Sequence, residues 1–146
     1  MPVQYHPKPG QILMCDFSGL QPPEMVKKRP VVIFTPELAG RAKLVTVVPL
    51  SSTRPDPIRP YHLQLPNREL PQLGWFQENE TWLKGDMLYT VALRRLDLVR
   101  LGKRDPETGK RRYFQRRLGQ ELRREIEVCV LNGLGLGHLV PPPERH

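Results

Sequence analysis

Lys43-Leu-Val-Thr-Val-Val-Pro-Leu50 carries apolar side chains at both odd and even positions. Successive side chains of a strand point to opposite faces, so this pattern indicates a strand that is buried on both faces. The β-branched run Pro30-Val-Val-Ile-Phe34 has the same character. We therefore expect residues 43–50 and 30–34 to form central strands of a sheet.

Shorter strands are expected on either side of this centre. We expect residues 11–17, which follow a proline-rich lead that cannot be helical, to form a first strand, and residues 61–65 to form another short strand. Residues 82–91 alternate between apolar and polar positions, which predicts a strand with Lys84 and Asp86 on one face. Residues 66–80, which include Trp75 and Phe76, are expected to form a loop.

The last third of the chain predicts a hairpin and a helix. Residues 98–114 flank the turn sequence Asp105-Pro-Glu-Thr-Gly109, which predicts a basic two-stranded arm of about residues 98–117. Apolar residues then recur at intervals of four before a glycine-rich end, so we expect an amphipathic helix over about residues 118–134. In 146 residues this makes a single domain, 1–146, of the α+β class and mainly β, with its core at about residues 9–137.

Positive charge is concentrated in one segment. The chain has 23 Lys and Arg against 15 Asp and Glu, a net charge of +8, and residues 94–124 hold twelve of the basic and four of the acidic residues. The rest of the chain is balanced in charge. Such a segment is typical of a surface that meets a polyanion, although an ordinary solvated surface with a charge bias has the same composition.

Several classes of protein and of site are excluded by what the sequence lacks. No apolar run approaches the roughly 18 residues of a membrane span, and the start lacks a secretory signal, so we expect a cytoplasmic protein without membrane contact. Glycine-rich phosphate loops and hydrolase motifs are absent, and the four histidines are scattered. Cys15 and Cys129 lie far apart in apolar surroundings, which predicts two buried thiols rather than a metal site or a disulfide.

Four short motifs carry a resemblance to a known family. They are Glu24-Met-Val-Lys-Lys-Arg-Pro-Val-Val-Ile33, Val47-Val-Pro-Leu-Ser-Ser-Thr53, Trp82-Leu-Lys-Gly-Asp-Met87 and Leu93-Arg-Arg-Leu-Asp97. In this order and spacing they resemble the MazF/PemK family of type II toxin–antitoxin toxins, over about residues 9–100 and the closing helix. The resemblance implies an SH3-like barrel with a C-terminal helix, assembled as a homodimer.

The same resemblance implies a function. Family members are mRNA interferases: they cleave single-stranded RNA at selected sequences without a metal ion or a cofactor. A ribose 2′-OH attacks the adjacent phosphate and leaves 2′,3′-cyclic phosphate and 5′-OH ends. The expected partners are single-stranded RNA and a cognate antitoxin protein. Two further assemblies to consider are a heterohexamer with the antitoxin and operator DNA bound through the antitoxin.

Four residues take catalytic roles by this resemblance. Arg29 matches the family's catalytic arginine, and holding the scissile phosphate suits it better than acting as a base, because an arginine side chain stays protonated in proteins. Ser51 falls where the family usually has a threonine. Asp86 matches an aspartate that acts as base, and Lys84 stands where the same members carry an arginine acid. The structural alternatives are a solvent-exposed arginine, a loop serine and an ordinary Lys84–Asp86 ion pair.

Residues next to these four are expected to support RNA binding. Glu24 would anchor the first loop or orient Arg29, and Lys28 directly precedes that arginine. The hydroxyls of Ser52 and Thr53 could take the place of the Ser51 hydroxyl in binding the phosphate.

Aromatic and basic residues further along the chain could also contact RNA. Trp82, and with it Trp75 and Phe76, could stack on unpaired bases, although core or dimer packing is the commoner use of such rings. Arg111 and Arg112 lie in the basic arm, which we interpret as an accessory surface that steers RNA or docks an acidic antitoxin.

Two functions from other classes remain open. A protein with the same barrel could inhibit DNA gyrase, as the related CcdB toxins do, but their function depends on the end of the C-terminal helix, which residues 133–140 do not resemble. A nucleic-acid-binding module that lacks catalysis would bind RNA with a steep salt dependence and release no products.

Overall fold

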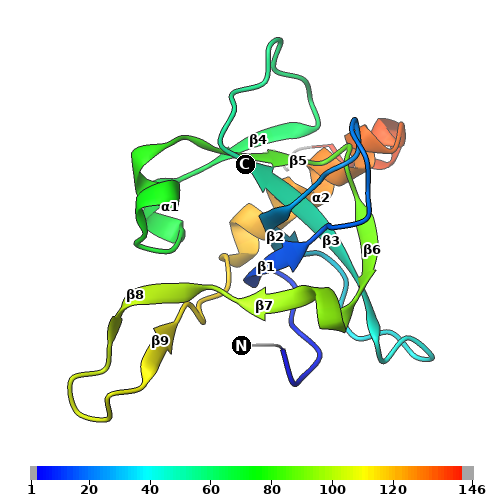
Figure 1. The fold of residues 1–146 in the computed structure, drawn as a ribbon. Coiled ribbons are helices and arrows are strands. Elements are labelled where there is room, and N and C mark those ends of the chain that lie inside the picture. The colour runs from blue at the N-terminus through cyan, green and yellow to red at the C-terminus, as the bar shows by residue number, and fades with distance from the viewer. Residues whose placement is uncertain (1–2, 143–146) are drawn as a thin grey trace.

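The computed structural model describes residues 3–142, and its strands form one large sheet and one small sheet (Figure 1). The large sheet contains β1 (Ile12–Asp16), β2 (Lys28–Ile33), β3 (Leu44–Ser51), β4 (His62–Leu65), β5 (Thr81–Lys84), β6 (Tyr89–Ala92) and β7 (Leu96–Leu98). The small sheet pairs β8 (Arg100–Arg104) with β9 (Arg111–Tyr113). The helices are α1 (Gly74–Glu78) and α2 (Gln120–Gly133), and short 3₁₀ turns are η1 (Asn67–Glu69), η2 (Leu93–Arg95) and η3 (Gly137–Leu139).

Strand β3 is the centre of the large sheet. The strand order is β4-β5-β3-β2-β1-β7, and β6 pairs with the first half of β3 while β5 pairs with its last two residues. The stretch from Val45 to Leu50 is buried, which confirms the prediction of a central strand. Among residues 3–142, β4 and β7 end the path without pairing to each other, so the expected SH3-like barrel is an open sheet. The class, α+β and mainly β, is confirmed.

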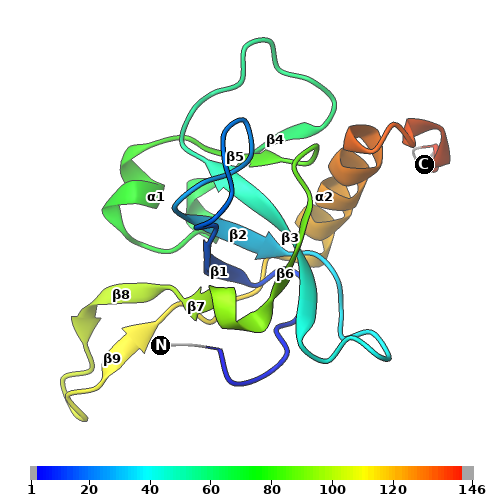
Figure 2. The same cartoon turned by 45° about the vertical axis from the view of Figure 1, so that its right-hand side comes forward.

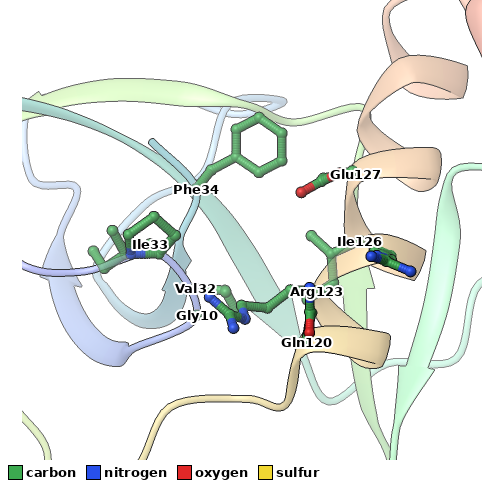
Figure 3. Close-up of a pocket in the computed structure, with 10 residues that line it drawn as sticks. Gly10, Val32, Ile33, Phe34, Gln120, Arg123, Ile126 and Glu127 are labelled. Atoms are coloured by element: carbon green, nitrogen blue, oxygen red, sulfur yellow. The ribbon is translucent and has the colours of Figure 1, made fainter. Parts of the chain in front are cut away.

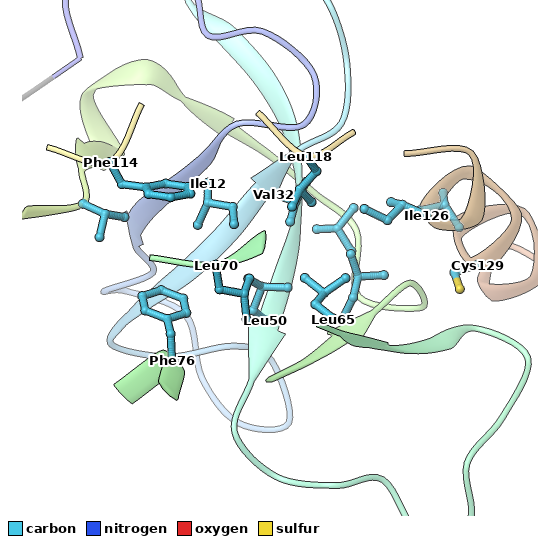
Figure 4. Close-up of a cluster of buried hydrophobic side chains, with 14 residues drawn as sticks. Ile12, Val32, Leu50, Leu65, Leu70, Phe76, Phe114, Leu118, Ile126 and Cys129 are labelled. Atoms are coloured by element: carbon cyan, nitrogen blue, oxygen red, sulfur yellow. The ribbon is translucent and has the colours of Figure 1, made fainter. Parts of the chain in front are cut away.

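Each face of the large sheet covers its own hydrophobic core. On one face, side chains such as Val32, Leu50 and Leu65 belong to a cluster that includes Ile126 of α2 (Figure 4). On the opposite face, a second cluster is built from Leu13, Cys15, Phe17, Val31, Ile33, Val45, Val47, Val91 and Leu96. The alternation along β1 and β2 explains this division, because neighbouring residues of a strand point to opposite faces.

Helix α2 crosses the first of these faces and ends in a glycine stop (Figure 2). The N–H of Leu136 bonds to the carbonyl of Leu131 at 2.8 Å, and the N–H of Gly135 bonds to the carbonyl of Asn132 at 3.1 Å. Gly135 has a φ of +74°, a left-handed conformation that favours glycine. The amphipathic helix expected from the sequence is therefore present, with the predicted kind of end.

Two expectations for the middle of the chain are wrong. The strand expected over residues 82–91 is interrupted: β5 ends at Lys84, a turn at Gly85 and Asp86 follows, and β6 begins at Tyr89. The expected loop of residues 66–80 contains α1, which buries Phe76. In both places tertiary contacts override the local pattern.

The remaining features of the fold agree with the sequence. The basic hairpin turns where expected, with Asp105 N–H bonded to the Lys110 carbonyl at 2.8 Å. Cys15 and Cys129 are both buried free thiols. No helix among the described residues is both long and apolar enough to cross a membrane.

Candidate functional site

The register of the large sheet places the expected catalytic side chains on one face. Residues directly opposite each other in an antiparallel ladder share a face, as do residues two apart in one strand. Val31 lies opposite Pro49, and Ser51 lies opposite Trp82. Arg29 is two residues from Val31, Ser51 is two residues from Pro49, and Lys84 is two residues from Trp82. Arg29, Ser51 and Lys84 therefore share one face of the sheet, the face turned away from α2.

Arg29 stands where β2 parts from β3. The β2–β3 ladder has its last pair at Val31 and Pro49, after which β3 pairs with β5 instead. The Arg29 side chain is half-buried, and its Nε is a buried atom without a hydrogen-bond partner in the described part of the chain. An unpaired buried donor costs about 1–3 kcal/mol, so an anionic ligand that accepted from this nitrogen would remove a native-state penalty.

The loop between β1 and β2 is held at both ends. Arg95 donates to the carbonyls of Asp16 at 2.9 Å and Ser18 at 3.0 Å, and the hydroxyl of Tyr89 accepts from Met25 N–H at 2.9 Å. Glu24 is exposed, and its carboxylate accepts from Gln21 N–H at 3.3 Å within the loop. That contact supports the loop-anchoring role for Glu24 over direct orientation of the arginine.

Ser51 ends β3 with its hydroxyl partly engaged. Its Oγ accepts from the N–H of exposed Thr53 at 3.1 Å, which leaves the hydroxyl proton free to donate to a ligand. Ser52 lies between them and is half-buried. The hydroxyls of residues 51–53 are therefore grouped at the end of β3.

Glu80 connects the loop that follows β3 to strand β5. Its Oε2 accepts from Arg54 Nε and from the indole N–H of Trp82, both at 2.9 Å, and these two hydrogen bonds lower the pKa of Glu80. The side chain of Trp82 is only 5% exposed. The buried ring favours core packing over base stacking for Trp82.

Lys84 and Asp86 do not share a strand face as expected, because the strand ends between them. Lys84 is the last residue of β5, whereas Asp86 is exposed in the following turn. The turn is held by the N–H of Gly85, which bonds to the carbonyl of Tyr61 at 2.8 Å, and by close packing of α2. The strand therefore positions Lys84, whereas the turn positions Asp86, and the charges of both act on His62.

His62 joins this group, and sequence reasoning missed it. It lies directly opposite Lys84 in the β4–β5 ladder, and its Nδ1 accepts from Arg59 N–H at 3.0 Å. The neutral ring therefore carries its proton on Nε2. Burial lowers the pKa of His62, Asp86 acts to raise it, and Lys84 and Arg59 act to lower it further. The available signal was the position of His62 in a predicted strand, but its pairing partner could not be known.

Three further residues that were expected to bind RNA lie outside the group formed by Arg29, Ser51, His62, Lys84 and Asp86. They are the exposed residues Lys28, Arg111 and Arg112. Lys28 points to the opposite face from Arg29, because the two are neighbours in β2. Arg111 and Arg112 belong to β9 in the separate hairpin. The hairpin begins next to the start of β2, because Arg100 of β8 lines one pocket together with Lys28 and Arg29.

Another pocket lies at the far end of β2 (Figure 3). It has a volume of about 220 Å³ and is lined by residues that include Ile33, Phe34, Arg123 and Glu127. None of the catalytic residues expected from the sequence lines it. Across the described residues, no three His, Cys, Asp or Glu side chains gather as a metal ion would require.

Comparisons with known proteins place this geometry in a family. A family model described as PemK-like, MazF-like toxin of type II toxin–antitoxin system matches residues 8–111. YifN of Escherichia coli K12 is 29% identical over 96% of this chain and 99% of its own length. An uncharacterized protein of Haemophilus influenzae Rd is 35% identical over 64% of this chain and 71% of its own length.

Solved structures show the same fold. The Mycobacterium tuberculosis toxin MazF-mt6 superposes with a TM-score of 0.55 at 15% identity, over 86% of this chain and 98% of that protein. MazF from Deinococcus radiodurans superposes with a TM-score of 0.58 at 16% identity, over 90% and 99% of the two chains. Because the family model matches residues 8–111, which is more than half of the chain and includes every strand of the large sheet, the chain belongs to the MazF/PemK family of type II toxin–antitoxin toxins.

Proposed function

We propose that the protein is a metal-independent endoribonuclease that cleaves single-stranded RNA. The observation that carries the proposal is the shared sheet face of Arg29, Ser51 and Lys84, with the Asp86 turn and His62 beside Lys84. Family membership supports the same reaction class. RNA brings its own nucleophile, so the protein has to supply only a base, an acid and positive charge.

In the proposed reaction, Asp86 accepts the proton of the attacking 2′-OH. The 2′-oxygen forms a bond to phosphorus while the bond from phosphorus to the 5′-oxygen breaks. Lys84 gives a proton to the departing 5′-oxygen, so the products are a 2′,3′-cyclic phosphate and a 5′-OH. Exposure of Asp86 keeps the carboxylate accessible to a ribose.

Three donors surround the phosphate in this scheme. Arg29 offers its guanidinium, including the unpaired Nε, to the non-bridging oxygens. Ser51 donates its free hydroxyl proton. His62 donates through Nε2–H, because its Nδ1 is already engaged by a backbone N–H. Donors fixed by strands and a loop before the substrate arrives stabilise developing charge at little reorganisation cost.

The test is cleavage of a long single-stranded RNA by the purified protein in EDTA. We expect products with 2′,3′-cyclic phosphate ends, and a loss of at least 100-fold in rate for Arg29→Ala and for Asp86→Asn. Ser51→Ala should slow cleavage, while Ser51→Thr, which keeps the hydroxyl, should retain most of it. Arg68→Ala, at an exposed position in η1, is the matched control.

Three outcomes would contradict the proposal. Wild-type cleavage that disappears in EDTA would show a metal-dependent reaction. RNA binding without any products would favour the non-catalytic binding module, and inhibition of supercoiling by gyrase without RNA cleavage would favour the CcdB-like alternative.

We also propose that the protein acts as a cytoplasmic homodimer neutralised by a cognate antitoxin. The family assignment supports an antitoxin partner, and the basic hairpin supplies a surface complementary to an acidic segment or to RNA. Co-expression with the neighbouring reading frame tests the partner: we expect relief of growth arrest and a stable co-purified complex.

A further inference from the structure

The pocket at the far end of β2 is built around one arginine. It has a volume of about 220 Å³ and lies between the end of β2 and the first half of α2. Arg123 of α2 lines it, and the Nε of this side chain is a buried atom without a hydrogen-bond partner among the described residues. Buried donors in folded proteins are nearly always paired, so the unpaired nitrogen makes Arg123 a candidate for holding a ligand.

The aliphatic part of Arg123 packs against Gly10. A Cβ at residue 10 would lie 2.6 Å from Arg123 Cδ, so the glycine leaves the space through which this side chain passes. Gly10 is itself fixed, because its N–H bonds to the Ile33 carbonyl at 2.8 Å and its carbonyl accepts from Leu118 N–H at 2.9 Å. The stem of Arg123 is therefore held in place before a ligand arrives, which lowers the entropic cost of binding.

The other walls of the pocket offer an apolar surface and a carboxylate. Val32, Phe34 and Ile126 line it, and Phe34 is half-buried. Glu127 also lines it, and Figure 3 shows Glu127 and Phe34 on one side of the opening with Arg123 on the other. Arg123 and Glu127 are four residues apart on α2, a spacing that allows an ion pair, yet the two form none. Both charges are therefore available to a ligand.

The arrangement matches one class of small molecule. A carboxylate pairs with a guanidinium through two parallel hydrogen bonds, an ammonium group pairs with a carboxylate, and an apolar group packs against apolar walls. An α-amino acid with an apolar side chain has all three groups. The pocket is smaller than the roughly 300–1,000 Å³ of typical small-molecule sites, which suits a ligand of this size.

We propose that this pocket, the Arg123 pocket, binds a free α-amino acid with an apolar side chain. Arg123 holds the carboxylate through Nε and a terminal nitrogen, Glu127 accepts from the ammonium group, and the apolar side chain lies against Phe34. None of the residues assigned to RNA cleavage lines the pocket, so this site is separate from the proposed reaction. An amino acid bound there stabilises the packing of α2 on β2, because only the folded chain brings the two elements together.

The binding test is thermal unfolding of the full chain at neutral pH in the presence of leucine or phenylalanine. A ligand that binds only the folded state raises Tm, so we expect either amino acid at about 10 mM to raise Tm by about 2–4 °C. Glycine, which lacks the apolar body, and leucinamide, which lacks the carboxylate, should leave Tm unchanged. No rise with leucine or phenylalanine, or an equal rise with leucinamide or with inorganic phosphate, would overturn the proposal.

Calorimetric titration of variants assigns the two charged contacts. Arg123→Met keeps an aliphatic stem beside Gly10 and removes the guanidinium, so leucine should bind at least about tenfold more weakly. Glu127→Gln, a change at an exposed residue, should weaken leucine several-fold and leave unchanged the weaker binding of 4-methylpentanoate, which is leucine without its amino group. Arg116→Met, which removes an exposed arginine outside the pocket, is the matched control.

The exposed glutamate keeps the proposal testable if Arg123→Met fails to fold. Leucine and 4-methylpentanoate that bind the wild type equally well, or an unchanged affinity for leucine in Glu127→Gln, would contradict recognition of an amino acid by this pocket.

Discussion

Gly85 and Gly133 meet backbone to backbone, and this contact joins helix α2 to the turn that carries Asp86. A Cβ at residue 133 would lie 2.6 Å from the Gly85 carbonyl carbon and 2.7 Å from Asp86 Cα. A Cβ at residue 85 would lie 2.7 Å from the carbonyl oxygen of Cys129. Only glycine at both positions lets the helix approach this closely, so α2 supports the turn that ends β5.

We expect Gly133→Ala to damage both stability and cleavage. The added methyl would push α2 away from the turn, at a cost of about 1–3 kcal/mol in the free energy of unfolding, and would displace Asp86. Urea unfolding and single-turnover cleavage of single-stranded RNA measure the two effects. Gly102→Ala is the control, because a Cβ there meets open space, and equal behaviour of the two variants would show that the contact is unimportant.

Tyr89→Phe should loosen the loop that precedes Arg29. The change removes the hydroxyl that accepts from Met25 N–H at 2.9 Å, a hydrogen bond worth about 0.5–1.5 kcal/mol. We expect a several-fold lower kcat/KM for RNA cleavage with a small decrease in Tm. Tyr113→Phe, in the hairpin, serves as the matched control. An unaltered kcat/KM in Tyr89→Phe would mean that loop order does not limit the reaction.

The lowered pKa of His62 predicts a pH-dependent stability. Burial favours the neutral ring, so the folded pKa lies below the usual value of 6.5, and the stabilisation is complete above that value and lost as pH falls through the lower pKa. We expect the free energy of unfolding to decrease from pH 7 to pH 5, and His62→Gln to remove that part of the decrease. The lowered carboxyl pKa values of Asp16, Glu80 and Asp105 act at more acidic pH. Parallel pH profiles of wild type and His62→Gln would contradict this assignment.

Both cysteines should resist alkylation in the folded protein. Burial raises the pKa of Cys15 to about 12 and that of Cys129 to about 11, so neither thiolate is populated at neutral pH. Intact-mass measurement after iodoacetamide at pH 8 should show no adduct in buffer and two adducts in guanidinium chloride. Rapid labelling without denaturant would show that one of the two cores opens readily.

Neutralising the hairpin should weaken RNA binding without slowing the bond-breaking step. Arg111, Arg112, Arg116 and Arg117 are exposed, and replacing them with glutamine should reduce the slope of log K against log salt by up to about 0.7 for each RNA phosphate that is no longer neutralised. Single-turnover rates at saturating protein should stay within about twofold. Glutamine at Lys8, Lys43, Arg68 and Arg94, which are also exposed, makes a charge-matched control. A large drop in the saturated rate would place the hairpin in the catalytic machinery.

Local sequence patterns were enough to predict the central strands, the basic hairpin and the closing helix. β3 is apolar at both parities because both of its faces are covered, and α2 repeats its apolar residues along a single face. The order and spacing of the short motifs identified the family and named Arg29, Ser51, Lys84 and Asp86. Each strand, helix or motif of this kind is a pattern of neighbouring residues, so it can be recognised in a single sequence without knowledge of the fold.

Contacts between distant segments decided the rest. Strand register brought His62 opposite Lys84, and register depends on the pairing of whole strands rather than on either strand alone. The contact between Gly85 and Gly133 broke a strand that looked continuous, because a helix far along the chain packs against it. Likewise, α2 and the end of β2 enclose a pocket around Arg123 that no local pattern contains. The sequence by itself determined the central strands, the hairpin, the closing helix and the chemistry available to them, whereas the tertiary structure decided where β5 ends and which side chains share a face of the sheet.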